Sequence, residues 1–376
     1  MRIPSIGISL NRRRSQALTA GVLAVAGLSA LLSAPAAVSH ARPTCFGKPA
    51  TIVGTNGPNV IRLTVHKDVV AGLAGNDVIE ATGTRTNHGN DIICGDGGND
   101  KIVGNNERNV LIGGPGNDRI KGGPGNDLIV GDNANPTGDE SGQTGRDDLN
   151  GTGGRDFIVG DNYARGNATG ASPDKDLRGL NNSDVVIGDS ASLRGNASGG
   201  ATDRLAGADG NDTVIGDSYA PYGNASGSGN DKPSPVNHKA GLNGGPGNDL
   251  LVGDNYTKTG TTSGGGSDVL QSGDGGDANA TCKPGTCDDV FYGDNYSASC
   301  GAKKTVPAVM CQIGDTSGGA PDLLTTDQGN DLLVGGPPND PALRGDGDKC
   351  KGGSGRDVAT LCEYTYKDVE SRLHLP

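Results

Sequence analysis

Apolar residues return every nine positions through much of this chain. Between Thr86 and Val130, five consecutive units follow Gly-x-x-Gly-Asn-Asp-x-(Ile/Leu)-x with small variations. The sixth position is polar or acidic, and the apolar eighth positions are Ile93, Ile102, Leu111, Ile120 and Ile129. A fixed period of this kind decides the architecture before any local propensity does. The pattern therefore predicts a stack of short, similar elements.

Each unit combines a turn with a short strand. In the unit Gly122 to Val130, the glycines and Asn126 supply turn geometry, including positive φ. The segment Leu128 to Val130 favours β-structure and directs one apolar side chain inward. Two units make one coil of about 18 residues, in which each strand pairs with the strand one coil away. The predicted fold is all-β, a parallel β-solenoid with two sheets and a thin aliphatic core.

A longer period begins after Val130. The tripeptide Gly-Asp-(Asn/Ser) occurs six times, and its first four copies are 29, 28 and 28 residues apart. Each coil in this region therefore gains about ten residues, which predicts a loop at the same place in every coil. Tyr163, Tyr219, Tyr256 and Tyr296 each follow one of these tripeptides. They either form a row that binds a ligand or cover the base of each loop.

The two ends of the chain differ from the repeats. Residues 1–41 combine Arg12, Arg13 and Arg14 with an apolar stretch from Ala17 to Leu32, which is typical of a secretory signal peptide. The alternative is an uncleaved membrane anchor, for which the apolar run is short of the ~20 residues that a spanning helix needs. We expect a regular block at 42–130, an interrupted block at 131–345 and a C-terminal cap at 346–376.

Composition limits the class of protein. Of 376 residues 67 are Gly, with three Phe, eight Tyr and no Trp, too little bulky apolar mass for one large globular core. Residues 1–41 hold four arginines and no acid, so their removal takes the formal net charge from −12 to −16. Such a chain disfavours nucleic acid and anionic membranes as partners and favours cations.

Eight cysteines fit an oxidising, extracellular compartment. Their positions suggest four local disulfides, which are Cys45–Cys94, Cys282–Cys287, Cys300–Cys311 and Cys350–Cys362. The outer two pairs lie at the ends of the array, where a stack exposes its core. A zinc site is the alternative, although the chain has no Cys-x-x-Cys segment.

The acidic sixth positions are the candidate metal ligands. Stacking places these carboxylates in columns along each edge, at about the 4.8 Å separation of neighbouring strands. A hard divalent cation held by carboxylates and turn carbonyl oxygens relieves their repulsion, and oxygen ligands on a Gly-rich loop favour Ca²⁺. The candidate ligands are Asp68, Asp77, Asp91, Asp100, Asp118, Asp127, Asp147, Asp156, Asp184, Asp203, Asp212, Asp249, Asp268, Asp289, Asp322, Asp331 and Asp357. Asn59 and Asn109 replace the carboxylate at two positions.

The segment Gly113 to Lys121 resembles the Gly-Gly-x-Gly-x-Asp-x-(apolar)-x unit of the hemolysin-type calcium-binding (RTX nonapeptide) repeat family. In stricter or looser form the resemblance covers most of residues 54–360. It implies a right-handed parallel β-roll, Ca²⁺ bound in the turns, and secretion.

These features lead to a hypothesis about function. We expect a secreted, non-enzymatic Ca²⁺-binding protein in which metal binding and folding are coupled. The alternative is an extracellular adhesion or carbohydrate-binding protein that reads a cell-surface glycan or protein with its Tyr-bearing loops. A third reading is an enzyme acting on a repeat face. Gly188-Asp189-Ser190 resembles one esterase motif, but Asn fills the third slot in four of the six copies, and His-Glu-x-x-His and Gly-x-Ser-x-Gly do not occur.

Overall fold

The computed structural model describes most of the chain between residues 42 and 372. The described residues are 42–81, 89–231, 242–271, 290–293, 296–297, 316–317, 322–326, 328–329, 331–335, 348–352, 354–355, 358–360, 362, 364–365 and 371–372. The predicted signal segment, the candidate ligands Asp289 and Asp357, and the cysteines Cys282, Cys287, Cys300 and Cys311 lie outside them.

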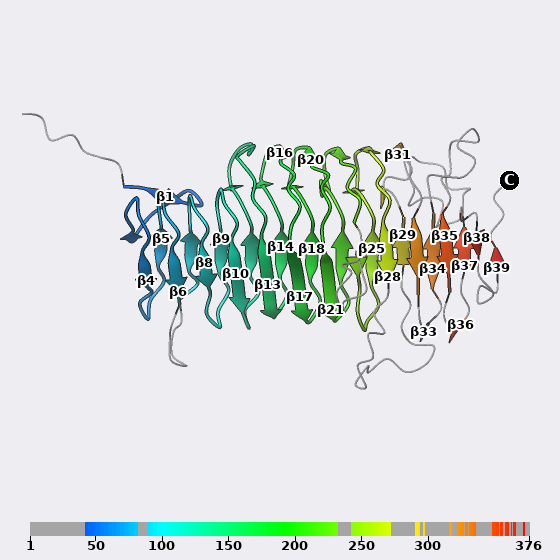
Figure 1. Ribbon diagram of the computed structural model, residues 1–376, viewed down its shortest axis with the longest axis horizontal. Helices are drawn as coiled ribbons and strands as arrows, with labels where there is room; N and C mark the ends of the chain where they lie inside the picture. Colours follow the sequence, from blue (N-terminus) through cyan, green and yellow to red (C-terminus); the bar gives the residue numbers. More distant parts are fainter. Residues whose placement is uncertain are drawn as a thin grey trace, which may run out of the picture. The chain divides into compact units, whose positions relative to one another are not determined.

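Two long parallel sheets carry the fold, and successive strands alternate between them (Figure 1). The first sheet consists of β4 (Val60–Arg62), β6 (Val78–Glu80), β8 (Lys101–Val103), β10 (Arg119–Gly123), β13 (Asp148–Gly153), β17 (Asp176–Asn181), β21 (Leu205–Asp209), β24 (Leu242–Asn243), β28 (Val269–Gln271), β32 (Leu323–Thr325), β35 (Lys349–Lys351) and β38 (Tyr364–Thr365). The second sheet consists of β3 (Ile52–Val53), β5 (Val69–Ala71), β7 (Ile92–Cys94), β9 (Val110–Ile112), β11 (Leu128–Val130), β14 (Phe157–Val159), β18 (Val185–Ile187), β22 (Thr213–Ile215), β25 (Leu250–Val252), β29 (Val290–Tyr292), β34 (Leu332–Val334), β37 (Val358–Thr360) and β39 (Ser371–Arg372). This confirms the predicted all-β fold, a parallel β-roll.

The core is one line of aliphatic side chains between the two sheets. The middle residue of each three-residue strand points inward, as with Ile102 of β8 and Leu111 of β9, which are both fully buried. These middle residues are the predicted eighth positions of the repeat. Strands are short because Gly and Asn turns interrupt the chain every few residues, so each coil buries only about two such side chains. Stacking makes the core continuous.

The longer coils after β11 build a lobe rather than an irregular loop. Each lobe adds one or two short strands that pair in parallel with those of the neighbouring coil, and we call this stack the lobes (Figure 1). Its strands are β12 (Ala134–Asn135), β15 (Tyr163–Ala164), β16 (Ala168–Thr169), β19 (Ala191–Ser192), β20 (Ala197–Ser198), β23 (Ala225–Ser226), β26 (Tyr256–Thr257), β27 (Thr262–Ser263), β30 (Tyr296–Ser297) and β31 (Thr316–Ser317). A further pair, β33 (Gln328–Gly329) and β36 (Ser354–Gly355), lies nearer the C-terminus.

Tyr163, Tyr219 and Tyr256 lie at the base of the lobes, and the side chain of Tyr296 is outside the described part of the structure. Tyr163 and Tyr256 each expose only 8 % of their surface and belong to the apolar cluster on the outer side of the second sheet. Tyr219 stacks on Tyr256 with ring centroids 5.2 Å apart, and Phe157 meets Tyr219 edge-on at 5.8 Å. Of the two readings of these tyrosines, the arrangement favours a cover over the sheet rather than an exposed row that binds a ligand.

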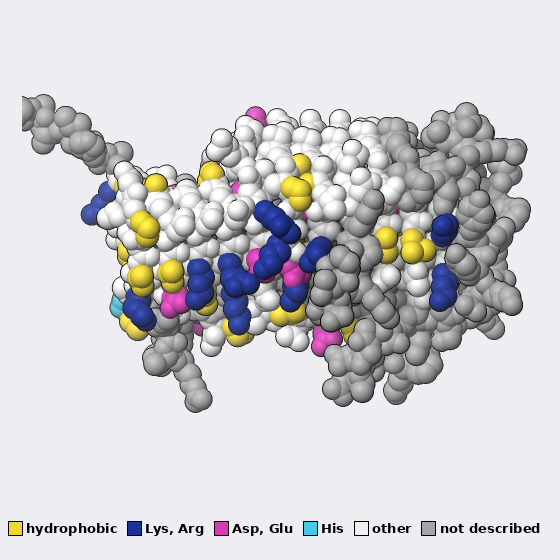
Figure 2. Space-filling model, in the orientation of Figure 1, with side chains coloured by type: hydrophobic (Ala, Val, Ile, Leu, Met, Phe, Trp, Pro, Cys, Tyr) yellow, Lys and Arg dark blue, Asp and Glu magenta, His cyan; other side chains and the backbone are white. Residues whose placement is uncertain are grey.

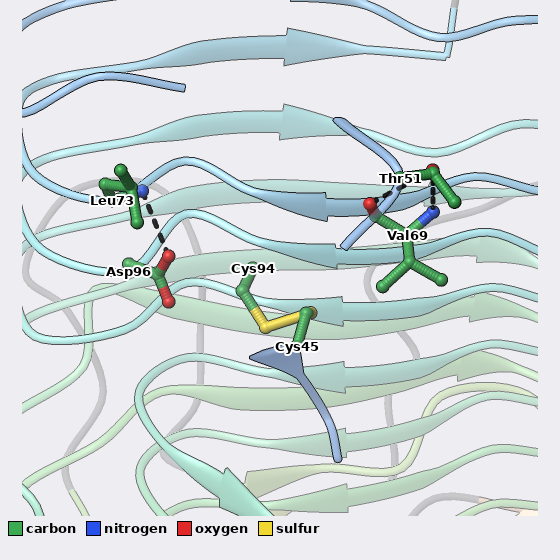
Figure 3. The surroundings of a disulfide bond; sticks show 6 residues. All are labelled: Cys45, Thr51, Val69, Leu73, Cys94 and Asp96. Carbon is green, nitrogen blue, oxygen red and sulfur yellow. Dashed lines mark hydrogen bonds between the residues drawn. A yellow bond between two sulfur atoms is a disulfide. The ribbon is translucent and has the colours of Figure 1, made fainter. Parts of the chain in front are cut away.

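The N-terminal hairpin covers the same outer side of the sheet before the lobes begin. It comprises β1 (Thr44–Cys45) and β2 (Lys48–Pro49), the antiparallel pair of the described structure. The Cys45–Cys94 disulfide fastens it to β7, close to the hydrogen bonds that join Asp96 to Leu73 and Thr51 to Val69 (Figure 3).

A second disulfide, Cys350–Cys362, lies near the C-terminus. The predictions of these two pairs are confirmed. Within the parts of the chain that the structure describes, no helix is long and apolar enough to span a membrane.

Candidate metal centre

The sixth residues of the repeats form two columns at the turns that enter the strands. We call edge A the column entering the first sheet and edge B the column entering the second. Edge A contains Asn59, Asp77, Asp100, Asp118, Asp147, Asp174, Asp203, Asp231, Asp268, Asp322 and Asp348. Edge B contains Asp68, Asp91, Asn109, Asp127, Asp156, Asp184, Asp212, Asp249 and Asp331.

One oxygen of each carboxylate joins consecutive coils. The main-chain N–H of most edge residues donates to Oδ1 of the equivalent residue in the next coil, at 2.7 Å from Asp77 to Asp100 and 2.6 Å from Asp100 to Asp118. The same bond recurs on edge B, at 2.8 Å from Asp127 to Asp156. Each aspartate of the two columns exposes at most 5 % of its surface. The columns are therefore part of the wall of the roll.

The other oxygen of most of these carboxylates is buried without a hydrogen-bond donor. This holds for Oδ2 of Asp77, Asp100, Asp118, Asp127, Asp147, Asp156, Asp174, Asp184, Asp203, Asp212 and Asp231. A buried, unpaired carboxylate oxygen costs several kcal/mol unless a proton or a cation meets it. A repeated arrangement of this kind indicates the ligand shell of a cation.

Most of these oxygens lie close to a main-chain carbonyl oxygen beside a glycine. A Cβ atom on Gly113 would lie 2.2 Å from Asp118 Oδ2 and 2.1 Å from Gly131 O. On Gly95 it would lie 2.2 Å from Asp100 Oδ2 and 2.6 Å from Gly113 O. The space beside the first glycine of the turn is therefore bounded by oxygens from two coils. Carboxylate and carbonyl oxygens are the ligands that Ca²⁺ prefers.

Burial raises the pKa values of these carboxyl groups. Desolvation is the largest cause at Asp118, whose pKa rises to about 9, with the nearby Asp147 as the next cause. Desolvation likewise raises the pKa of Asp127 to about 7 and that of Asp184 to about 8. Without a cation, Asp118 and Asp184 favour the protonated form at neutral pH.

No single turn offers three acidic side chains around one point. Within the described residues, no group of three or more His, Cys, Asp or Glu side chains is placed to hold a metal ion by itself. A cation on either edge would therefore depend on two carboxylates from neighbouring coils, with main-chain carbonyl oxygens as the remaining ligands.

Asparagine amides occupy the equivalent space at three places in the first block. The Nδ2 group of Asn105 donates to Asp91 Oδ2 and to Gly89 O, both at 2.8 Å. Asn109 Nδ2 donates to Glu107 O at 2.7 Å, and Asn59 Nδ2 donates to Gly57 O at 2.7 Å. In each case an N–H group does what a cation would do, since it pairs the turn oxygens.

Asp68 and Asp91 therefore differ from the other predicted ligands. Asp68 Oδ2 accepts from the N–H of Thr64 at 2.7 Å, and Asp91 Oδ2 accepts from Asn105. Both oxygens of each carboxylate have protein donors. Their role as ligands stays a prediction, and they lack the buried, donor-free oxygen found at Asp100, Asp118 and Asp156.

Replacing Asn109 by Asp is expected to add a cation site. The Asn109→Asp change removes an amide that bonds to Glu107 O and lies 3.3 Å from Asp127 Oδ1, and it places a second carboxylate there. We expect about one more Ca²⁺ per chain and lower stability in chelator, because like charges then meet unscreened. Elemental analysis and urea unfolding would measure both. Asn106→Asp, at a site exposed to solvent, is the control, and an equal gain there would contradict the interpretation.

Three edge residues were missed by the sequence pattern. Asp174, Asp231 and Asp348 complete edge A, where they make the same ladder bonds as the predicted aspartates. They do not follow the Gly-x-x-Gly-x-Asp spacing, because the lobes separate the two halves of the turn. The 27 to 29 residues between Asp147, Asp174, Asp203 and Asp231 are the signal that identifies them.

The acidic excess of the chain is concentrated inside these columns. Figure 2 shows more Lys and Arg than Asp and Glu on the visible described surface, although the sequence has 44 acidic and 32 basic residues. Exposed Lys101 pairs with Glu80 at 3.0 Å, and Arg119 pairs with Asp148 at 2.8 Å. These surface ion pairs are made by Glu80, Asp148 and Asp176, none of which belongs to edge A or edge B.

The family comparison agrees with this geometry. The model of the RTX calcium-binding nonapeptide repeat matches residues 50–81, 85–102, 103–137, 141–162, 198–218 and 316–340. The chain carries RTX calcium-binding nonapeptide repeats. RTX repeats bind Ca²⁺ as structural ions, so the buried Asp-rich turns are those of a Ca²⁺-binding repeat protein. No curated protein and no solved structure matches the chain.

Proposed function

We propose that this RTX repeat protein is a secreted, non-enzymatic scaffold whose folding depends on Ca²⁺ bound along edges A and B. The observation that carries the proposal is the repeated buried Oδ2 atom without a donor, as at Asp100, Asp118 and Asp156. When bound, the ion supplies positive charge to these oxygens. The residues of the chain provide the carboxylates, the carbonyl oxygens and the exclusion of water.

Coupling between folding and the metal follows from the geometry of the columns. Each half of a site belongs to a different coil, for example Asp118 to one and Asp147 to the next. An unfolded chain therefore has no preformed site, and the free energy of binding contributes to folding. Secretion is consistent with the Cys45–Cys94 and Cys350–Cys362 disulfides, since such bonds persist in oxidising compartments where Ca²⁺ is abundant.

The alternative of an adhesion or carbohydrate-binding protein depended on tyrosines at the lobes. Tyr163 and Tyr256 are buried, and Tyr219 packs between Phe157 and Tyr256. They therefore offer little surface to a glycan or protein partner. We propose calcium-dependent scaffolding as the single function.

A metal count on the purified protein tests this proposal. The protein is dialysed against millimolar Ca²⁺, and bound ions are counted by elemental analysis before and after treatment with chelator. We expect several Ca²⁺ per chain, lost in chelator together with β-sheet circular dichroism. Magnesium at the same concentration is the control and should restore little signal, because Mg²⁺ retains its water shell more strongly. A count near zero in Ca²⁺ would refute the proposal.

A further inference from the structure

A second row of buried aspartates lies beside edge A, beneath the lobes. Its first four members are Asp132, Asp161, Asp189 and Asp217, each of which directly follows the glycine that opens a lobe, and Asp254 continues the stack. All four have 0 % exposure. The N–H of each donates to the carbonyl oxygen of the next, at 3.3, 3.1 and 3.1 Å, so they stack one per coil. We call them the inner row; none of them is a sixth residue of the nonapeptide.

Neighbouring carboxyl groups of the inner row touch one another. Those of Asp132 and Asp161 lie within hydrogen-bonding reach, as do those of Asp161 and Asp189 and those of Asp189 and Asp217. Two carboxylates at this separation and without access to water cannot both be ionised unless a cation lies beside them.

The inner row is only partly supplied with donors: Ser172 donates to both oxygens of Asp161 and Gly229 to both oxygens of Asp217, whereas Asp132 and Asp189 each have a donor at one oxygen only. Asp132 Oδ2 accepts the N–H of Gly145 at 3.0 Å, and Asp189 Oδ2 accepts the N–H of Ala201 at 3.1 Å. The Oδ1 atoms of Asp132 and Asp189 are buried and have no donor. The ionisable groups that act on these two carboxyls are all aspartates. The unpaired oxygens therefore face a negatively charged interior.

The inner row and edge A converge at the same turns. The charge of Asp147 acts on Asp132, and the charge of Asp203 acts on Asp189. Main-chain carbonyl oxygens lie at the same turns as these carboxylates. A Cβ on Gly160, the residue before Asp161, would lie 2.2 Å from Asp174 Oδ2 and 1.8 Å from Gly188 O. Each such turn thus brings together two carboxylates and at least one carbonyl oxygen.

We propose that the inner row forms an additional line of Ca²⁺ ligands, in which Asp132, Asp161, Asp189 and Asp217 join the edge A aspartates beneath the lobes. The balance of charge favours a divalent ion. Each lobed coil contributes two buried carboxylates here, so about one divalent cation per coil leaves the interior neutral. Edge B contributes a single carboxylate per coil. The proposal rests on the proposed function and extends it to residues outside the nonapeptide position.

The lobes explain why extra carboxylates belong at these turns. In a narrow turn such as Gly113 to Asp118, the main chain stays against the previous coil, and a Cβ on Gly116 would lie 1.8 Å from Gly98 O. In a lobed coil the chain leaves the edge after Asp161 and returns near Ser172, whose N–H donates to Asp161 Oδ2 at 3.1 Å and whose hydroxyl donates to Asp161 Oδ1. The side chain of Asp161 thus brings oxygens to a place that the main chain has left.

Isosteric substitutions test the inner row. In the full chain after removal of any signal segment, Asp161→Asn and Asp189→Asn each delete a charge and keep the shape. We expect each variant to bind about one Ca²⁺ fewer than wild type, and the double variant about two fewer. Asp139→Asn, at an exposed position in the first lobe, is the matched control and should keep the full count, since Asn retains the Oδ1 that accepts the N–H of Asn167.

The count is made by elemental analysis on the folded fraction after gel filtration, with circular dichroism as a check on folding. Asp132→Asn, at the start of the row with one inner-row neighbour, provides a second variant if an interior one fails to fold. Unchanged Ca²⁺ in these variants, with increased stability in chelator, would overturn the proposal, because it would show that the row holds protons. A wild type without bound Ca²⁺ would instead refute the proposed function itself.

Discussion

In chelator at about pH 8 the protein is expected to lose its β-sheet signal, and acidification to about pH 5 is expected to restore much of it without any metal. The reason is that protons can replace the cation on the buried carboxylates. Desolvation raises the pKa of Asp118 to about 9, that of Asp184 to about 8 and that of Asp212 to about 7, from 3.8 in water.

The direction of the effect follows from proton linkage. Between pH 3.8 and about 9 the folded, metal-free chain binds more protons than the unfolded chain, so its stability falls as the pH rises. Each unit of pKa shift corresponds to about 1.4 kcal/mol. The combined free energy of a few such pKa shifts is therefore as large as the free energy of unfolding of a typical domain, which is ~5–15 kcal/mol.

Circular dichroism across a pH series, in chelator and in millimolar Ca²⁺, would measure this. With Ca²⁺ present the signal should stay high at about pH 8, because the cation competes with protons for the same oxygens. An intact β signal in chelator at that pH would show that the carboxylates need neither partner. The Asp118→Asn variant is expected to keep more structure in chelator than wild type, because an amide carries no charge to neutralise.

A methyl group on Gly113 is expected to damage an edge A site directly. In the Gly113→Ala variant the added Cβ would lie 2.1 Å from Gly131 O and 2.2 Å from Asp118 Oδ2, which is closer than any real contact. The added atom occupies the space between the two coils and pushes the carboxylate away. We expect a loss of about 3 kcal/mol in Ca²⁺, together with fewer bound ions.

The Gly97→Ala variant is the matched control. Its Cβ would meet only Leu73 O, at 3.9 Å, and neither glycine has a φ in the left-handed region. The two substitutions therefore differ in space and not in backbone strain. Urea unfolding in millimolar Ca²⁺ should show a change of at most about 0.5 kcal/mol for Gly97→Ala. Equal losses in both variants would mean that the space beside Gly113 has no special role.

Much of edge A and edge B could be predicted from the sequence because the repeat is strictly periodic where the turns are narrow. Asp100, Asp118 and Asp127 follow the spacing, and all three lie buried at the predicted place. Asp174 and Asp231 escaped prediction because insertions of variable length separate them from the glycines that they face. The number of residues between two positions then no longer predicts whether they lie close together in the fold.

Two further features depended on contacts between coils. The aspartates of Gly-Asp-(Asn/Ser) were visible in the sequence, but nothing local shows that Asp161 and Asp189 meet. The asparagine amides that donate to turn oxygens could not be predicted for the same reason, since Asn105 and its partner Asp91 are 14 residues apart in the sequence.

The sequence by itself determined the two sheets, the inward line of Ile, Leu and Val, and the acidic edges. Each of these follows from a nine-residue period in which turn, strand and carboxylate recur together. Only the tertiary structure decided which carboxylate oxygens lack a hydrogen-bond donor and which accept a hydrogen bond from an amide. It also decided in which coils two buried carboxylates lie together beneath the lobes. Those properties depend on how neighbouring coils stack, because the partner of each oxygen comes from another turn.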